Sequence, residues 1–373
     1  LVCGMFAVGT VSAQQVEISQ AEDLNEVSAE GSYVVVDDID ASGIEGFEPI
    51  GDEENRFVGS FDGDGYVISG LTVNSSESEH VGLFGYVGSE GTVTNVGLEN
   101  VEVKGGDSTG GLVGRNEGEV RRSHVTGSVE GGDNVGGLVG RNVGTVTESY
   151  ASTNVVGEDR VGGLVGRNVE SVSESYAKGS VEGASTVGGL VGSNVRGVVD
   201  SYATTDVEGE NELGGLVGTD VGGTIERTYA GGEMGVAPAS GGIIGAGNSN
   251  TEVTDSYWNR ETMSEGRGEG VALMTSDMTG DAAVGSMEFE FGEGWVHRDN
   301  SYPALAWEVH GYEDETETTN LGVGDGGEDE DDNSSGSGED DGYQPPDEGL
   351  PGFGVSVAAV ALVVGGALIR RRS

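Results

Sequence analysis

The sequence is short of cysteine and of basic side chains. Its single cysteine, Cys3, excludes internal disulfides, a Cys-x-x-Cys zinc site and a cysteine nucleophile in the body of the chain. Lysine and arginine number 17 against 66 aspartates and glutamates, which gives a formal net charge of −49 at pH 7. Such a charge repels nucleic acid and anionic lipid, so neither is an expected partner. Dense carboxylates stay soluble when concentrated salt screens them. We therefore expect a salt-loving source, with a mesophilic acidic surface protein as the alternative.

Catalytic and metal-binding motifs are also lacking. No His-x-x-x-His spacing relates the four histidines, and no Gly-x-Ser-x-Gly elbow occurs. Asp62 and Asp64 resemble the start of a calcium loop, but the position that needs glutamate is Val73. We therefore expect no catalytic residue, no metal ligand and no cofactor, with calcium kept as a weaker alternative.

What the sequence does have is internal repetition. A Gly-Gly-Leu-Val-Gly segment recurs at intervals of 26 residues, and its leucines are Leu112, Leu138, Leu164, Leu190 and Leu216. An asparagine column keeps the same phase, at Asn116, Asn142, Asn168 and Asn194. Beside a serine column runs a tyrosine column, at Tyr150, Tyr176, Tyr202, Tyr229 and Tyr257. The apolar pieces are short and β-branched with no 3.6-residue stripe, so the pattern predicts strands and no helix.

A coil of about 26 residues accommodates three short strands and three turns, and stacking places like residues in register roughly 4.8 Å apart. We therefore expect an all-β fold, a right-handed parallel β-helix (solenoid), although the residues themselves leave the handedness open. Aligned asparagines would form a structural hydrogen-bonded ladder, and aligned leucines and valines an elongated core. Whether Tyr150 or its neighbours Ser149 and Ala151 face inward stays open, because a bend beside them would reverse the alternation.

These repeats resemble the GLUG motif family through their Gly-Gly-Leu-Val-Gly core, the asparagine after it and the later Ser-Tyr-Ala segment. The flanks are similar too, at residues 57–71 and at Ser256-Tyr257-Trp258-Asn259. The resemblance covers about residues 45–307. It implies a parallel β-helix on bacterial and archaeal surface proteins, some of which carry peptidase domains, and it implies no defined reaction for the repeats.

One column is site-like. Arg115, Arg141 and Arg167 would stack on one edge, with Ser193 and Thr219 at the next two places. Stacked like charges are unfavourable unless they are partnered. The arginines could bind a carboxylated or sulfated glycan as an anionic-ligand ladder. The alternative, which we favour from the residues alone, is that they pair with neighbouring acids.

The two ends of the chain are predicted to be targeting segments that are not part of the fold. Residues 1–13 read as an incomplete signal peptide with cleavage before Gln14, so we expect export. An uncharged apolar run at residues 353–369 precedes three arginines, which places the C-terminus in the cytoplasm. With Pro351, Gly352 and Phe353 in front of it, this end resembles the PGF-CTERM sorting signal of archaeal surface proteins. The resemblance implies processing by an archaeosortase; a plain membrane anchor is the alternative.

The organisation that we predict has six regions: an incomplete signal peptide at 1–13, an N-terminal cap at 14–56, a GLUG-repeat β-helix at 57–258, a C-terminal cap at 259–310, an acidic disordered stalk at 311–349, and the sorting signal with a transmembrane helix at 350–373. A small independent domain is the alternative to the C-terminal cap. Asn74 and Asn333 lie in N-glycosylation sequons.

The function that we predict is a non-catalytic one, in adhesion or envelope structure such as a surface layer. The protein would be exported, envelope-anchored through its C-terminal membrane segment, and partnered by an envelope or extracellular glycan or protein. The alternative is a secreted polysaccharide lyase or hydrolase, since parallel β-helices host such enzymes, but that support is analogy of fold. A lyase would need dissimilar groups clustered in one irregular coil, whereas these coils are alike.

Overall fold

The computed structural model describes residues 15–76, 78–263 and 269–311. The chain divides into two compact units, residues 1–315 and 316–373, and the second lies outside the described residues. The predictions for the signal peptide, the acidic stalk, Asn333, the Pro351-Gly352-Phe353 signal and the membrane segment fall outside them as well. Within the described residues, no helix is long and apolar enough to cross a membrane.

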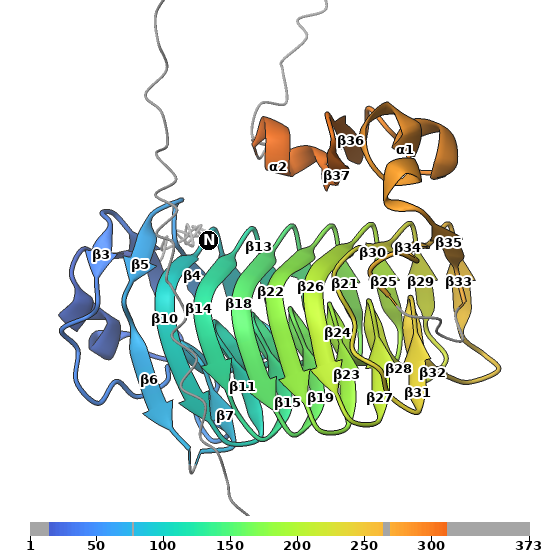
Figure 1. Ribbon diagram of the computed structural model, residues 1–373. Helices are drawn as coiled ribbons and strands as arrows, with labels where there is room; N and C mark the ends of the chain where they lie inside the picture. The colour runs from blue at the N-terminus through green and yellow to red at the C-terminus, as the bar shows by residue number, and fades with distance from the viewer. Residues whose placement is uncertain (1–14, 77, 264–268, 312–373) are drawn as a thin grey trace, which may run out of the picture. The chain divides into compact units, whose positions relative to one another are not determined.

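The described chain is a parallel β-solenoid, as predicted (Figure 1). One coil runs through β17 (Thr145–Thr147), β18 (Tyr150–Gly157), β19 (Asp159–Gly162) and β20 (Val165–Asn168). Each of these strands pairs in parallel with the equivalent strands of the coils before and after it. A coil therefore contains four strands, not the three that we expected, because the glycine pair of the repeat makes an additional corner between the third and fourth strands.

Four parallel sheets result, which we name A to D. Sheet A contains β1 (Val16–Ile18), β2 (Ser32–Val35), β4 (Ser60–Asp62), β9 (Thr92–Thr94), β13 (Glu119–Arg121), β17, β21 (Ser171–Ser173), β25 (Gly197–Val199), β29 (Thr224–Glu226) and β33 (Glu252–Thr254). Sheet B contains β3 (Ile39–Asp40), β5 (Val67–Ser69), β6 (Thr72–Ser75), β10 (Gly97–Gly105), β14 (His124–Glu130), β18, β22 (Tyr176–Gly183), β26 (Tyr202–Gly209), β30 (Tyr229–Ala230), β34 (Tyr257–Asn259) and β35 (Val271–Leu273).

The other two sheets are shorter. Sheet C contains β8 (Phe84–Val87), β12 (Val113–Asn116), β16 (Val139–Asn142), β20, β24 (Val191–Asn194), β28 (Val217–Asp220) and β32 (Ile244–Gly247). Sheet D contains β7 (His80–Val81), β11 (Ser108–Gly110), β15 (Asp133–Gly136), β19, β23 (Thr186–Gly188), β27 (Glu212–Gly214) and β31 (Ala239–Gly241). Each regular coil passes through sheets A, B, D and C in that order.

A left-handed residue turns the chain between sheets A and B. Glu148 has a φ of 50°, and the equivalent Glu174 and Asp200 have φ values of 48° and 46°. This bend reverses the alternation of side chains, so Ser149 and Ala151 are fully buried while Tyr150 points outward. The orientation of Tyr150, which the sequence left open, is therefore set by a left-handed backbone conformation at a residue that is not glycine.

The core is built from aligned apolar side chains. All five leucines of the 26-residue series are fully buried, and so are the valines of sheet A such as Val146. The backbone of Leu164 is fixed from both sides: its carbonyl accepts a hydrogen bond from Leu138 N at 3.0 Å, and its N–H donates to Leu190 O at 2.9 Å. Gly163, beside it, admits no side chain, since a Cβ would lie 2.2 Å from the carbonyl oxygen of Gly189.

Two polar ladders are buried in the same core. Each asparagine Nδ2 of the Asn116 to Asn194 series donates to the Oδ1 of the next coil, at 2.8, 2.9 and 2.8 Å, and Asn194 donates to Asp220 at 2.7 Å. In the serine series, the backbone N–H of Ser149 donates to Ser175 Oγ at 3.2 Å, and the Ser149 hydroxyl donates to the Thr147 carbonyl. Polar side chains therefore satisfy one another along the solenoid axis.

Parallel pairing begins at β1, which lies before the region where we expected the first coil. β1 and β2 pair in parallel and β2 pairs with β4, while a 3₁₀ helix, η1 (Ala21–Glu26), connects the first two strands. Phe57, Phe61 and Phe84 pack together inside these N-terminal coils, with ring centroids 4.9 and 5.3 Å apart. Large rings thus fill the N-terminal end of the core.

The C-terminal segment lies along the outer flank of sheet B. It comprises η2 (Thr275–Asp277), α1 (Gly280–Ser286), β36 (Trp295–Arg298), β37 (Ser301–Leu305) and α2 (Ala306–His310), with β36 and β37 antiparallel. Its buried Met278, Phe289 and Trp295 form one apolar cluster with the outward tyrosines of sheet B. The segment that we predicted as a cap therefore covers the side of several coils.

Candidate functional site

The register of sheet C brings the three predicted arginines together in one row. Arg115 pairs with Arg141 across β12 and β16, and Arg141 pairs with Arg167 across β16 and β20. All three side chains point outward and are half-buried. We call these residues the arginine row. Tyr86 on β8 precedes the row, and Ser193 on β24 follows it.

The N-terminal end of the row is paired with a carboxylate. Arg115 contacts Glu117 at 2.7 Å, and Arg56 reaches the same carboxylate at 3.1 Å. The two guanidinium groups lie against the Tyr86 ring, 4.5 and 4.7 Å from its centroid, and the Tyr86 hydroxyl donates to Glu117. Burial and this hydrogen bond raise the pKa of Tyr86 to about 12. Although burial opposes it, donation from Tyr86 and Arg115 lowers the pKa of Glu117.

The other two arginines differ from Arg115. Within the described residues, neither Arg141 nor Arg167 has an ion pair or a hydrogen bond to a carboxylate, and the buried Nε of Arg141 has no partner. Burial, then repulsion from Arg115 and Arg167, lowers the pKa of Arg141. The expectation that these arginines pair with neighbouring acids is therefore wrong for two of the three. The reason is that Glu117, the acid that pairs with Arg115, is replaced by Val143 and Val169 at the equivalent places of the next two coils.

A second polar row on sheet D flanks the arginine row. At one end His80 lies against Tyr86, with ring centroids 5.4 Å apart, and at the other Thr219 donates to Glu212 at 2.6 Å. By the same register, Asn134 lies beside Arg141. Seven buried side-chain polar atoms lack a hydrogen-bond partner in the described chain, and four of them fall in these two rows: His80 Nδ1, Arg115 Nε, Asn134 Oδ1 and Arg141 Nε. Unsatisfied groups are thus concentrated here.

Sequence reasoning missed Tyr86, His80 and Asn134. Asn134 precedes Arg141 by seven residues, as Arg160 precedes Arg167, so the repeat phase could have revealed the flanking row. Tyr86 and His80 lie in a degenerate repeat, where the phase is lost. Of the other predicted residues, Asn74 lies exposed on β6, and the four asparagines of the ladder are buried and structural.

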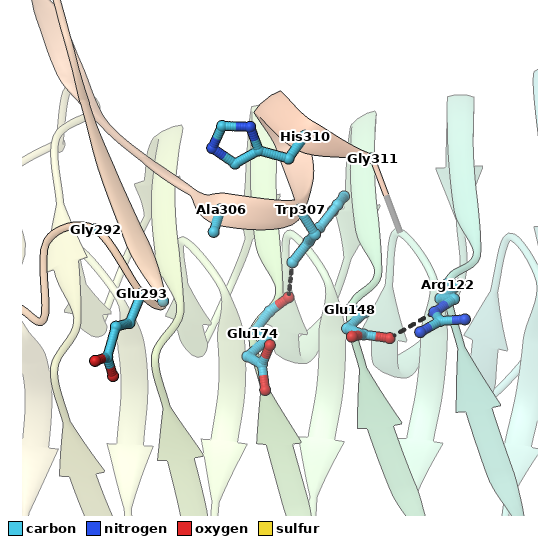
Figure 2. A pocket seen from close by; sticks show the side chains of 10 residues that line it. Arg122, Glu148, Glu174, Gly292, Glu293, Ala306, Trp307, His310 and Gly311 are labelled. Atoms are coloured by element: carbon cyan, nitrogen blue, oxygen red, sulfur yellow. Dashed lines mark hydrogen bonds and ion pairs between the residues drawn. The ribbon is translucent and has the colours of Figure 1, made fainter. Parts of the chain in front are cut away.

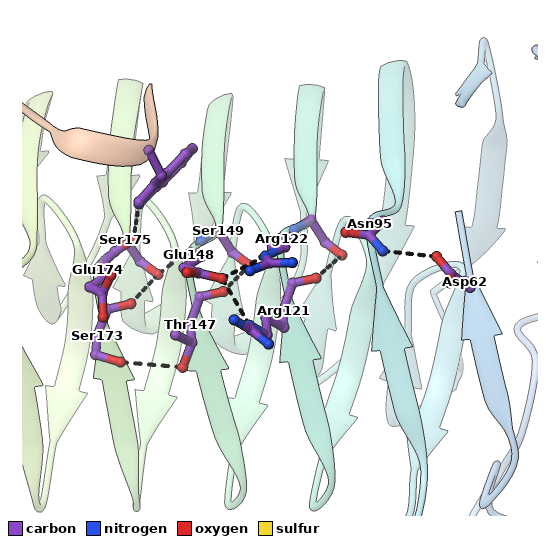
Figure 3. Close-up of polar contacts among 12 residues, drawn as sticks. Asp62, Asn95, Arg121, Arg122, Thr147, Glu148, Ser149, Ser173, Glu174 and Ser175 are labelled. Atoms are coloured by element: carbon purple, nitrogen blue, oxygen red, sulfur yellow. Dashed lines mark hydrogen bonds and ion pairs between the residues drawn. The ribbon is translucent and has the colours of Figure 1, made fainter. Parts of the chain in front are cut away.

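A column of acidic residues, Glu148, Glu174 and Asp200, lies at the bend between sheets A and B (Figure 3). Glu148 contacts Arg121 and Arg122 at 2.8 Å each, and Asp200 accepts from Arg227 at 2.7 and 2.6 Å. Between them, the carboxylate of Glu174 has no hydrogen bond or ion pair with the described residues. Partial burial and repulsion from Glu148 and Asp200 raise its pKa, although its side chain keeps an exposed surface.

Glu174 lines a pocket of about 580 Å³ under the C-terminal segment (Figure 2). Trp307 forms part of its wall and donates from Nε1 to the Glu174 carbonyl at 3.0 Å. Arg122 is engaged with Glu148 there, while His310 is exposed. Among the described residues, no group of three His, Cys, Asp or Glu side chains is placed to hold a metal ion.

Comparison with known proteins bears on the repeat itself. Residues 105–130 match the GLUG motif. The sequence is 39% identical over 121 residues to halomucin of Haloquadratum walsbyi, a match that covers 30% of this chain and 1% of halomucin. It is 38% identical over 96 residues to a candidate Gly-rich membrane protein of Evansella cellulosilytica, which covers 24% of this chain and 11% of that protein. The chain thus spans a small part of either relative.

A solved structure shares the fold. It is that of a candidate immunoglobulin A1 protease from Bacteroides ovatus, with a TM-score of 0.58 and 20% sequence identity over 80% of this chain and 94% of that one. At this identity the likeness shows the β-helical architecture alone. The comparisons thus show a GLUG motif in this chain and a β-helical fold.

Proposed function

We propose that this protein is an exported, non-catalytic cell-surface solenoid in adhesion or envelope structure, and that its arginine row binds an anionic polymer. The observation that carries the proposal is the pair Arg141 and Arg167. They are half-buried, adjacent and without a carboxylate partner among the described residues of a chain with a net charge of −49. Like charges stacked in register repel one another, and a bound anion relieves that repulsion.

A polymer suits the row better than a small anion does. Equivalent side chains of successive coils repeat at 4.7–4.8 Å, as the stacked rings on sheet B show. A chain with one carboxylate or sulfate on each sugar presents charges at a similar repeat, so several contacts form together and their affinities multiply. Support for a surface or membrane location comes from the names of the relatives, halomucin and a Gly-rich membrane protein. The predicted archaeosortase partner and membrane anchor are part of this proposal.

A polysaccharide-acting enzyme is the alternative function. The structural neighbour is named as a protease, but the likeness to it shows the fold alone. The arginine row offers the same group at successive steps, whereas catalysis needs dissimilar groups at one place. We therefore infer binding without turnover at this face, and the proposal requires no cofactor.

The test is a series of arginine-to-serine changes in the full chain, because serine is the residue at the next place in the row, Ser193. Binding to immobilised polygalacturonate should weaken at each step through Arg115→Ser, Arg141→Ser and Arg167→Ser, and should weaken as salt rises. Arg196→Ser is the matched control, since Arg196 is an exposed arginine outside the row. Equal binding by the triple variant and the control would contradict the site. New reducing ends or unsaturated product would contradict the non-catalytic function.

A further inference from the structure

The outward face of sheet B carries a continuous stack of rings. His124, Tyr150, Tyr176, Tyr202 and Tyr229 follow one another at centroid spacings of 4.7–4.8 Å and within 8° of parallel. The C-terminal segment buries the later tyrosines, whereas His124 and Tyr150 are only half-buried. The aromatic surface therefore continues past the segment that covers it.

A pocket of about 470 Å³ lies where the cover ends. Tyr150 and Tyr176 line it from sheet B, and Trp307 from α2 closes one side. Trp307 is inclined by 25° and 20° to these two tyrosines, with ring centroids 6.3 and 5.7 Å away. A pocket of this size with aromatic walls and a few polar groups is typical of a site for a small ligand.

The two cationic side chains of the pocket, Lys178 and Arg298, keep N–H groups that can donate to a ligand. Glu308 has a side chain only 5% exposed, and its oxygens accept from the Tyr202 hydroxyl at 3.0 Å and from Leu305 N at 2.9 Å. Lys178 and Arg298, which come from distant parts of the sequence, approach this carboxylate only to 3.8 and 3.5 Å. Lysine has three donors and arginine five, so both cations keep N–H groups for another acceptor.

The charge of the pocket is opposite to that of the molecule. Two cations and one carboxylate leave one positive charge, and Lys178 Nζ lies 4.3 Å from the centroid of the Tyr176 ring. Burial lowers the pKa of His124, so this ring adds no charge at neutral pH. A ligand of this pocket should therefore have an anionic group, an apolar face to lie against the aromatic rings, and hydroxyl groups.

We propose that this pocket binds one acidic sugar residue, a uronate, with its carboxylate on Lys178 and Arg298 and its C–H face against Trp307. Charge-assisted hydrogen bonds would hold the carboxylate, and the negative face of the indole attracts polarised C–H groups. Tyr150 and His124 line the same pocket, and their hydroxyl and ring nitrogens would serve as hydrogen-bonding groups for the sugar hydroxyls.

This site goes beyond the arginine row and stands independently of it. Sheets B and C are not neighbours in the coil, so one polymer strand on the arginine row does not occupy the pocket. A protein with both sites could hold two strands of an acidic polysaccharide at once, which suits a role in envelope structure.

The experiment is titration of the full chain with digalacturonate, followed by calorimetry and by acrylamide quenching of tryptophan fluorescence. Trp258 and Trp295 are buried, so quenching reports mainly on the half-buried Trp307. We expect one molecule bound per chain, protection of Trp307, and at least tenfold weaker binding of the neutral methyl ester. Equal affinity for acid and ester would overturn the role of the cations.

Two lysine variants make the matched comparison, because Lys104 and Lys178 are the only lysines in the chain. Lys178→Thr introduces the residue that register places beside it, Thr204, and should weaken digalacturonate about tenfold. Lys104→Thr, on β10 of the same sheet, should leave affinity within twofold. Equal affinities of the two variants, with unchanged thermal midpoints, would overturn the pocket. Digalacturonate binding that is lost in the triple arginine-row variant and kept in Lys178→Thr would assign it to the arginine row instead.

Discussion

Side-chain ladders are the residue-scale feature that holds successive coils in register. Asn168 shows how: its Nδ2 donates to Asn194 Oδ1, to Glu170 O and to Gly197 O, while its Oδ1 accepts from Asn142. The ladder ends at Asp220, whose other oxygen accepts from Gly222 N and Gly223 N. A carboxylate has no amide to donate onward, so it closes the chain of donors.

Asn168→Ala should destabilise the solenoid by roughly 2–6 kcal/mol, because the Oδ1 of Asn194 loses its donor and the Nδ2 of Asn142 loses its acceptor, each at about 1–3 kcal/mol. Thermal melts followed by circular dichroism measure the change. Asn154→Ala is the control, since Asn154 lies exposed on β18 and should cost less than about 0.5 kcal/mol. Equal midpoints for the two variants would show that the ladder does not stabilise the fold.

Glu174 predicts a pH dependence. Its pKa in the folded chain lies above the ordinary glutamate value of 4.5, so the ionised form is the one that folding penalises. The penalty is absent below about pH 4.5 and grows as pH rises through the folded pKa. Glu174→Gln should therefore raise the melting midpoint at pH 7 and have no such effect at pH 4. Glu170→Gln, at an exposed glutamate near Arg196, should show no stabilisation at pH 7. A constant effect of Glu174→Gln at both pH values would contradict the assignment.

Periodicity accounts for what the sequence could predict at this scale. Asn142 and Arg141 were placed in rows because each recurs every 26 residues in the same phase. The orientation of Tyr150 could not be predicted, because it depends on a left-handed Glu148 and glutamate carries no signal for that conformation. The missing partner of Arg141 could not be predicted either, because the sequence does not show that Glu117 is the acid that contacts Arg115 and that Val143 takes its place in the next coil.

The C-terminal segment is the element that departs most from the repeat. Its Met, Phe and Trp residues indicated a buried surface, but the sequence contained nothing to say which face of the solenoid they cover. The structure shows that Trp295 is fully buried, 4.4 Å from Phe289 between ring centroids and 5.9 Å from Tyr229, with Nε1 donating to Asp200 at 3.2 Å. Trp295 is therefore the largest fully buried side chain through which the segment contacts the tyrosine stack.

Trp295→Ala should release the segment while the coils stay folded. Removing a buried indole costs roughly 3–5 kcal/mol, and that loss falls on the segment because the coils pair with one another independently. Limited proteolysis should cut the variant within residues 275–311, with the β-sheet circular dichroism spectrum unchanged. Val309→Ala, at an exposed side chain of the same segment, should resist cleavage like the parent. Equal resistance of both variants would mean that the tyrosine stack does not anchor the segment.

At the scale of the whole molecule, two properties oppose one another. Repetition supplies parallel pairing, core and ladders in coil after coil, and this architecture could be predicted because the phase was visible in the sequence. The same repetition stacks acids above acids, as at Glu148, Glu174 and Asp200. The arginines that neutralise this column contact Glu148 and Asp200 and leave Glu174 unpaired. Repulsion within the acidic column is thus reduced by dissolved salt ions as well as by local ion pairs.

Stability should consequently rise with salt. The Debye length is about 30 Å at 0.01 M and about 3 Å at 1 M, so repulsion among stacked carboxylates acts across many coils in dilute salt and hardly beyond one neighbour in concentrated salt. Screening also weakens the ion pairs of the arginines, but 66 acids against 17 bases make repulsion the larger sum. The melting midpoint of the full chain should therefore increase between about 0.01 M and about 1 M KCl. Sucrose is the control, because it favours compact states by exclusion without screening charge. A midpoint that rises equally in sucrose and KCl, or stays constant in KCl, would mean that charge repulsion does not limit the stability of this solenoid.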